Sequence, residues 1–219
     1  MNSRRALTPA PLWFQFAAAA VCLLPSAPAR ADAATESDPD LQWSGWWGEV
    51  GLGASRVSRS PGVTAGRVHG NFALHLRVGH TLGPHLVAGL LVDGNNADTS
   101  GPLYIDGIYV GGSPNRGPGI GLLAAFLRLY PLQERSWFVE GAAGSAKFFS
   151  SLPGETNGWG PGFQFAVGRD FNFGDQARWS LEPSVGFSAG RAGAVEVAGT
   201  WQKMNYRAAE LTLGLAYHP

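Results

Sequence analysis

Several segments of the chain alternate large apolar residues with small or polar residues at every second position. From Phe72 to Gly79 the even positions hold Phe, Leu, Leu and Val, and the odd positions hold Ala, His, Arg and Gly. A period of two residues is the repeat of a β-strand whose two faces meet different surroundings. No helical apolar period is present after Trp43, so the sequence predicts an all-β fold.

Eight segments carry this alternation, five of them clearly and three less regularly. The clear segments are Trp46–Gly53, Phe72–Gly79, Phe163–Gly168, Trp179–Ser188 and Glu210–Tyr217. The less regular ones are Leu86–Asp93, Leu122–Tyr130 and Trp137–Ala146. We therefore expect an antiparallel up-and-down barrel of eight strands.

The composition of the polar face indicates which face points outward. It consists mostly of Gly, Ala and Ser with isolated charges and hardly any Lys, and only 15% of the whole chain is charged, against about 25% in typical soluble domains. Small residues suit the narrow interior of an eight-stranded barrel. The large apolar residues would then face lipid, as they do in a transmembrane barrel.

The segments are joined by connections that alternate between short and long, as periplasmic turns and outer loops do in outer-membrane barrels. We expect the long connections to be mobile loops in solvent, although Tyr104–Val110 could pair and raise the strand number to ten. The short connections are Thr81–His85, Pro131–Ser136 and Gly174–Arg178, and the long ones are Arg56–His69, Gly94–Gly119, Phe149–Gly160 and Gly190–Gln202.

The N-terminus has the three parts of a secretory signal peptide. Arg4 and Arg5 precede the apolar run Trp13–Leu24, and Ala29-Arg30-Ala31 offers a small-x-small cleavage site. The apolar run is shorter than the roughly 20 residues that a membrane-spanning helix needs. We predict a signal peptide over residues 1–31 with cleavage after Ala31, a short disordered leader over 32–42 and a barrel over 43–219.

Aromatic residues gather at the short-turn end of the predicted strands. Rings with a polar edge prefer the boundary of a bilayer, so a ring of aromatic side chains is expected at that level. The residues predicted to form this interface are Trp46, Tyr130, Trp137, Phe171, Trp179 and Tyr217.

Three stretches resemble the small eight-stranded outer-membrane β-barrel superfamily, the OmpA/OmpX/OmpW-like domains. They are Phe126–Pro131 running into Trp137–Gly141, Trp179–Gly186, and Thr212–Tyr217. The resemblance covers Trp43 to Tyr217 and implies a monomeric barrel in the bacterial outer membrane with both chain ends in the periplasm. It also implies contact with outer-membrane lipids, and recognition of the closing strand by the barrel-insertion machinery. Such proteins usually end on an aromatic residue, whereas here His218 and Pro219 follow Tyr217.

The strand pattern directs a set of charged residues into the barrel. Unpaired charges are costly in a narrow lumen, so we expect Glu49 to pair with Arg77 and Glu140 with Arg128. Asp170 and Glu182 fall opposite each other as like charges, which Arg169, Arg178, water or a proton would relieve. The predicted lumen charge network consists of Glu49, Arg77, Arg128, Glu140, Asp170 and Glu182, with His75 nearby.

We interpret this network as a polar plug that closes the pore, and a conducting or gated path is the alternative. A lipid-modifying enzyme would need a base beside a hydroxyl, but no serine lies at strand spacing from His75 or His69. No His, Asp or Glu cluster has metal-ligand spacing, no cofactor motif is present, and 16 basic residues balance 16 acidic ones, which argues against nucleic-acid binding.

The sequence therefore predicts a non-enzymatic structural or surface-exposed barrel whose loops face outside. Three alternatives remain: OmpW-like passage of small hydrophobic molecules, an outer-membrane lipid-modifying enzyme, and a soluble lipocalin-like periplasmic carrier. The carrier is suggested by Gly45-Trp46-Trp47, which matches the Gly-x-Trp at the start of lipocalins.

Overall fold

The computed structural model describes residues 45–60, 62–83, 85–112, 119–131, 136–149, 156–173 and 178–218, which are nearly all β-strand. No helix among these residues is long and apolar enough to cross a membrane. The predicted signal peptide and leader, residues 1–42, lie outside the described residues.

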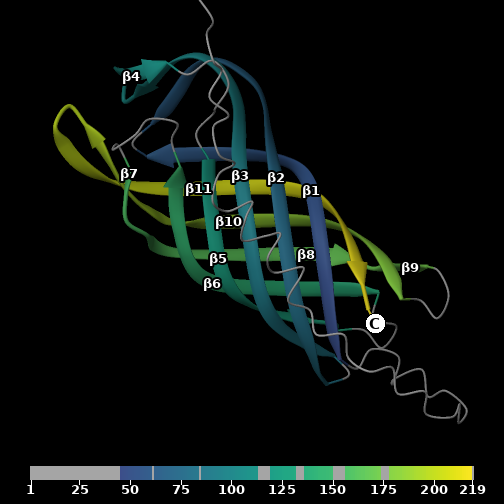
Figure 1. Cartoon of the computed structure of the whole chain (residues 1–219). Helices are drawn as coiled ribbons and strands as arrows, with labels where there is room; N and C mark the ends of the chain where they lie inside the picture. Colours follow the sequence, from purple (N-terminus) through teal and green to yellow (C-terminus); the bar gives the residue numbers. More distant parts are fainter. Residues whose placement is uncertain are drawn as a thin grey trace, which may run out of the picture. The chain divides into compact units, whose positions relative to one another are not determined.

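Eight strands form a closed antiparallel barrel in which each strand pairs with the next along the chain (Figure 1). The barrel closes where β1 and β11 pair, with Leu52 opposite Leu213. This confirms the predicted fold class and strand number. In order, the barrel strands are β1 (Trp46–Ser60), β2 (Val63–Gly83), β3 (Leu86–Ile105), β5 (Gly119–Leu129), β6 (Trp137–Phe149), β8 (Gly160–Arg169), β10 (Trp179–Val197) and β11 (Thr200–Tyr217).

Three short strands extend the barrel wall without adding to its circumference. β4 (Ile108–Gly112) pairs with β3, whereas β7 (Thr156–Asn157) and β9 (Phe171–Phe173) pair with β10. Tyr104 lies opposite Tyr109 in the β3–β4 hairpin, so the segment that could have raised the count to ten does pair, but outside the barrel circuit.

The prediction that the long connections are solvent loops was wrong for three of them, since the described parts of Arg56–His69, Gly94–Gly119 and Gly190–Gln202 are mostly strand, whereas residues 150–155 of Phe149–Gly160 lie outside the described residues. β1 continues to Ser60 and β2 begins at Val63, and two-residue turns join β3 to β4 at Asp106-Gly107 and β10 to β11 at Ala198-Gly199. All four of these turn residues have positive φ, between 48° and 80°. Turns of this kind match the right-handed twist of paired strands, so the strands can extend well past the barrel. We call this side of the barrel the hairpin end and the other the short-turn end.

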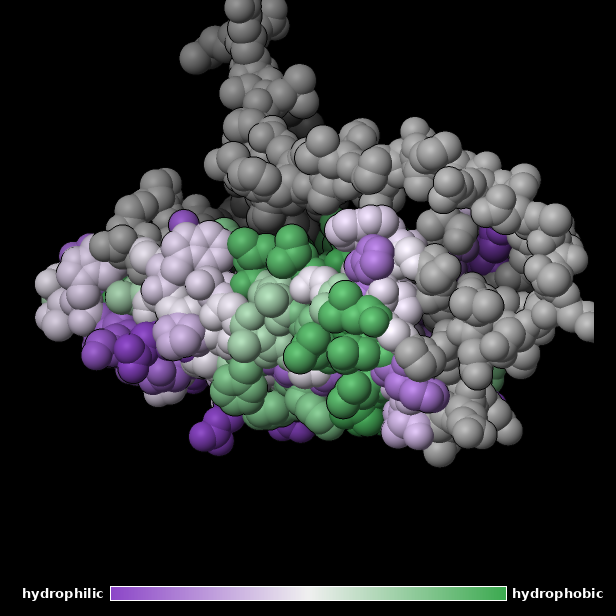
Figure 2. Space-filling view, turned by 90° about the horizontal axis from the view of Figure 1, so that it is seen from below, coloured by the Kyte–Doolittle hydropathy of each residue, from purple (hydrophilic) through white to green (hydrophobic). Residues whose placement is uncertain are grey.

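The outward face of the barrel is apolar in its middle. Leu52, Leu90 and Val185 are each 63% exposed, and Leu211 is 62% exposed. Figure 2 shows an apolar zone with hydrophilic residues on either side of it on the face in view. Since leucine and valine at this exposure would be costly in water, the pattern matches a wall that contacts lipid hydrocarbon. We call this zone the apolar belt.

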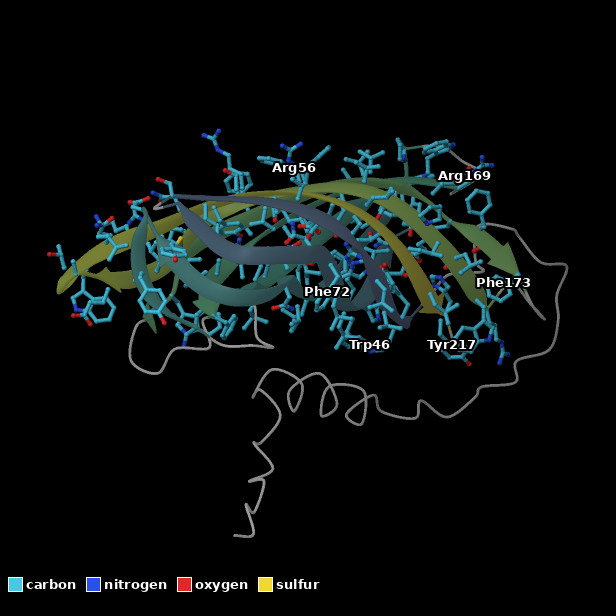
Figure 3. All side chains as sticks on the ribbon, turned by 90° about the horizontal axis from the view of Figure 1, so that it is seen from above. Trp46, Arg56, Phe72, Arg169, Phe173 and Tyr217 are labelled. Atoms are coloured by element: carbon cyan, nitrogen blue, oxygen red, sulfur yellow. The ribbon has the colours of Figure 1, made fainter. Side chains whose placement is uncertain are left out.

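Towards the hairpin end the outward positions change from apolar to basic. On β11 the exposed Leu215, Leu213 and Leu211 are followed by exposed Arg207 and Lys203. On β1 the exposed Arg56 occupies the corresponding position beyond Leu52, and it points away from the barrel in Figure 3. The change marks one edge of the apolar belt.

The interior differs from the expectation of small residues with isolated charges. β3, β5 and β6 place large apolar side chains inside, among them Leu91, Leu122, Phe126, Phe138 and Phe148, all at most 2% exposed. Both faces of these strands are therefore apolar, which is why their alternation is less regular in the sequence. Glycine, alanine and serine line the lumen mainly on β1, β8, β10 and β11.

Candidate functional site

Ionisable side chains from five strands meet inside the barrel towards the short-turn end. The inward parity of each strand delivers one or two of them, and each is at most 2% exposed. Together they form what we call the arginine network: Glu49 on β1, His75 and Arg77 on β2, Arg128 on β5, Glu140 on β6 and Glu182 on β10.

Arg128 is the centre of the arginine network. Its Nε donates to Glu140 Oε2 at 2.9 Å, its Nη1 to Glu182 Oε2 at 2.6 Å and its Nη2 to Glu49 Oε2 at 2.9 Å. Glu140 lies on the neighbouring strand, whereas the strands of Glu49 and Glu182 are separated from β5 by at least one other strand. One guanidinium group thus joins three walls of the barrel.

Arg77 adds two further ion pairs. Its Nη1 lies 2.7 Å from Glu49 Oε1 and its Nε lies 2.9 Å from Glu140 Oε1. The strand register places Glu49 opposite Arg77 and Arg128 opposite Glu140, the two pairs expected from the sequence. The tertiary structure joins these two pairs into a single network.

His75 completes the arginine network next to Glu49, with Nε2 2.7 Å from Glu49 Oε1. Glycines on the adjoining strands make room for the side chains of His75 and Glu49. A Cβ at Gly51 would overlap the His75 imidazole, and a Cβ at Gly214 would overlap the Glu49 carboxylate. At these two inward positions glycine is required by the charges opposite.

Aromatic rings cover the arginine network. The Arg128 guanidinium carbon lies 4.0 Å from the ring centre of Phe138 and 4.7 Å from that of Trp47. Such rings attract a cation and also exclude water, which strengthens the ion pairs beside them. The network therefore places hydrogen-bonded, buried side chains across the lumen at this level.

The sequence predicts that Asp170 and Glu182 lie opposite each other as like charges, and the structure gives both of them hydrogen-bond donors other than Arg169. Glu182 accepts hydrogen bonds from Arg128 and from Ser180 Oγ at 3.0 Å, and Asp170 Oδ2 accepts one from the Tyr130 hydroxyl at 2.9 Å. Arg169 does not face Asp170 or Glu182, because it occupies an outward position at the end of β8. Its guanidinium lies against the rings of Trp137 and Phe171, at 5.5 and 4.8 Å.

The predicted aromatic interface is wrong at one position. Tyr130 is only 3% exposed, and it packs inside the barrel against Phe138. It follows β5 on the inward parity, so its ring turns to the lumen and its hydroxyl to Asp170. The other five predicted rings are exposed by 36% to 50%: Trp46, Trp137, Phe171, Trp179 and Tyr217.

Exposed aromatic side chains do gather at the short-turn end. Figure 3 shows Tyr217, Phe173 and Arg169 towards one end of the barrel. The rings of Trp179 and Tyr217 lie 4.7 Å apart on paired strands, and Trp46 meets His80 edge-on at 5.1 Å. Exposed rings gathered at one level in this way fit the boundary of a bilayer.

His218 lies beyond the last strand, inside the short-turn opening. Its ring is 6.0 Å from that of Trp47, and its Nε2 is 3.3 Å from Ser180 Oγ. Burial lowers the pKa of His218 to about 4, and the positive charge of Arg128 lowers it further against the opposing effect of Glu49. The imidazole is therefore neutral at pH 7, and the residue after the expected terminal aromatic has a packing role.

The arrangement offers little support for acyl-transfer chemistry. Ser180 and His218 form a serine–histidine contact, but the Ser180 side chain is fully buried and donates its proton to Glu182. His75 is bonded to Glu49, and the His69 side chain lies outside the described part of the structure. Among the described residues, no group of three or more His, Cys, Asp or Glu side chains is placed to hold a metal ion.

A second polar cluster, nearer the hairpin end, was not found from the sequence. Asn95 Nδ2 donates to Asp93 Oδ2 and to Glu210 Oε1, both at 3.0 Å. Gln164 Nε2 and Ser188 Oγ donate to the two oxygens of Glu210, at 3.2 and 2.9 Å. We call these five residues the Asp93 layer. Strand parity was the available signal, since Asp93 and Glu210 occupy inward positions in two of the alternating segments.

Comparison with known proteins gives structural likeness without sequence likeness. No family model matches the chain, and a search of curated proteins finds no match. The crystal structure of Neisserial surface protein A is similar with a TM-score of 0.57 at 14% identity, covering 80% of this chain and 98% of that one. This likeness shows the fold, a small antiparallel β-barrel.

Two further solved barrels match more loosely. Outer membrane protein AlkL, determined in lipid bilayers, has a TM-score of 0.44 at 18% identity and covers 85% of this chain and 93% of its own. Outer membrane protein OprG from Pseudomonas aeruginosa has a TM-score of 0.39 at 13% identity, with coverages of 81% and 98%.

Proposed function

We propose that this chain is a non-enzymatic outer-membrane barrel that is closed to ions and presents its hairpin end to the outside of the cell. The bonding of Arg128 to carboxylates on three separate strands carries the proposal. A guanidinium held in this way ties the walls together across the lumen. Water and ions would have to break several buried ion pairs to pass.

The second part of the proposal concerns how the barrel sits in the bilayer and how it reaches it. The apolar belt would contact outer-membrane lipids, with the exposed rings at the short-turn end on the periplasmic side. Export would use the signal peptide predicted for residues 1–31, and the barrel would insert as a monomer. The outward residues of β11, which end in Leu213, Leu215 and Tyr217, would be read by the barrel-insertion machinery.

The test of closure is conductance in a planar lipid bilayer. The folded chain should insert without discrete current steps, whereas regular channel openings would contradict the plug. Location is tested separately by fractionating cells: the chain should appear in the outer membrane and migrate differently on a gel before and after heating. Recovery in the soluble periplasmic fraction would favour the carrier alternative.

Passage of small hydrophobic molecules remains a second candidate because of one observation. Beyond the Asp93 layer the interior carries apolar side chains, including Ile120, Phe148 and Met204, all at most 3% exposed. A hydrophobic molecule entering from the hairpin end would meet this surface before it reached the arginine network. Saturable binding of pyrene to the folded barrel, weakened by Met204→Asp, would support this candidate, and non-saturable partition alone would contradict it.

A further inference from the structure

The Asp93 layer has more hydrogen-bond acceptors than donors. Asp93 Oδ1, Asn95 Oδ1 and Gln164 Oε1 are buried and have no hydrogen-bond partner. The three side chains are between 1% and 4% exposed. Leaving a buried polar atom unbonded costs free energy, so several such oxygens in one layer call for a ligand that supplies positive charge.

The donors in this layer are already turned to the carboxylates. Asn95 uses its one amide nitrogen to bridge Asp93 and Glu210, and Gln164 also directs its nitrogen to Glu210. Each amide thereby leaves its oxygen without a donor. Two hydroxyls beside the layer are also buried without a partner: Ser55 Oγ, on the residue opposite Glu210 in β1, and the Tyr206 hydroxyl on β11.

Among the described residues, neither carboxylate of the layer has a cationic ion-pair partner. The ion pairs found among the described residues all belong to the arginine network, and none includes Asp93 or Glu210. Arg77 and Arg128 are bonded to Glu49, Glu140 and Glu182 instead. Two carboxylates facing each other in a desolvated lumen require compensation by protons or by a cation.

We propose that the Asp93 layer is a binding site for one calcium ion. Its candidate ligands are all oxygens, the donor type that hard divalent cations prefer. Asp93 Oδ2 and Glu210 Oε1 both lie 3.0 Å from the same amide nitrogen, which occupies the position between the two carboxylates. On binding, the Asn95 and Gln164 amides rotate and present their oxygens.

Calcium fits this layer better than magnesium does. Two carboxylates neutralise a divalent ion, and calcium accepts six to eight oxygens in flexible geometry. Magnesium demands octahedral geometry and retains several waters, which a layer closed by side chains from four strands does not favour. The residues come from β3, β8, β10 and β11, so an ion here would join opposite walls of the barrel.

The test is calorimetric titration of calcium into the full chain, folded in detergent and freed of metal with a chelator. We expect saturable binding with one ion per barrel, and calcium should raise the urea midpoint because it binds only the folded state. Absence of saturable binding at millimolar calcium would overturn the proposal and would leave protons as the compensating charge.

Substitutions within the Asp93 layer test whether calcium binds at this place. Asp93→Asn and Glu210→Gln should each weaken calcium binding by at least about tenfold, since both remove a ligand charge. Glu196→Gln removes the same charge on β10, outside the layer, and is the matched control that should bind calcium as the parent does. Heat-dependent gel migration shows which variants fold. Equal affinity in the parent and in whichever layer variant folds would overturn the assignment.

Discussion

Arg128 on β5 and Glu182 on β10 are joined by a 2.6 Å ion pair between strands that are not neighbours in the barrel. Both side chains are completely buried. A bond of this kind fixes the distance between opposite walls, which the hydrogen bonds between adjacent strands do not do.

Replacing Arg128 with methionine should destabilise the barrel more than any substitution of an outward arginine. Three buried glutamates would lose their shared cation, and breaking a buried ion pair costs about 3–5 kcal/mol. Urea unfolding in detergent or vesicles measures the change. Arg169→Met is the control, since that arginine only lies against exposed rings and its loss should cost about 1 kcal/mol or less. Equal losses in both variants would refute the central role of Arg128.

Arginine at Leu213 should cost about 2–4 kcal/mol in a bilayer, because the position lies in the apolar belt at its middle. Asn205→Arg on the same outward face of β11, beyond the belt, should cost little. Unfolding free energies in lipid vesicles compare the two. A harmless Leu213→Arg would mean that the belt does not face hydrocarbon.

Alanine at Gly51 should cost about 1–3 kcal/mol, because its methyl group would overlap the buried His75 ring. Gly141→Ala is a suitable comparison, since a Cβ there meets no atom within 4 Å. The second variant should unfold within about 0.5 kcal/mol of the parent. If the two alanine variants unfold at the same urea concentration, the inward packing at Gly51 is not as tight as described.

Removing the hydroxyl of Tyr130 should destabilise the barrel by about 1–3 kcal/mol, since Asp170 would lose its hydrogen-bond donor in a buried position. Tyr217→Phe removes the same group from an exposed ring at the same end of the barrel and should change stability little. Urea unfolding of both variants decides between an inward and an interfacial Tyr130, because an interfacial ring would give similar small effects.

Asparagine at Ala198 should stabilise the β10–β11 hairpin by up to about 1 kcal/mol. Ala198 has a φ of 49°, a left-handed conformation that asparagine adopts more readily than alanine. Gly199→Ala should act in the opposite direction, because the next residue also has positive φ, at 79°. The unfolding midpoints of the two variants should lie on opposite sides of the parent.

The alternation of residues was sufficient to predict the barrel and the facing of most inward charges. In a strand, position parity decides on which face a side chain lies, so Glu49, Arg77, Arg128, Glu140 and Glu182 could be directed inward from the sequence. Adjacent pairing followed from strand order, because Glu49 faces Arg77 and Arg128 faces Glu140 in the register. The same rule could have identified Asp93 and Glu210, and would have turned Tyr130 inward.

The sequence by itself therefore determined the strands, their inward faces and the pairs between neighbouring strands. The tertiary structure alone decided which charges meet across the lumen, since contacts such as Arg128 with Glu182 depend on how far each strand is shifted along the barrel axis. It also decided that two of the long connections contain hairpins, because the turns at Asp106-Gly107 and Ala198-Gly199 let the strands continue. The alternation of residues along a strand determines on which face a side chain lies, and the closure of the sheet into a barrel determines which side chains it contacts across the lumen.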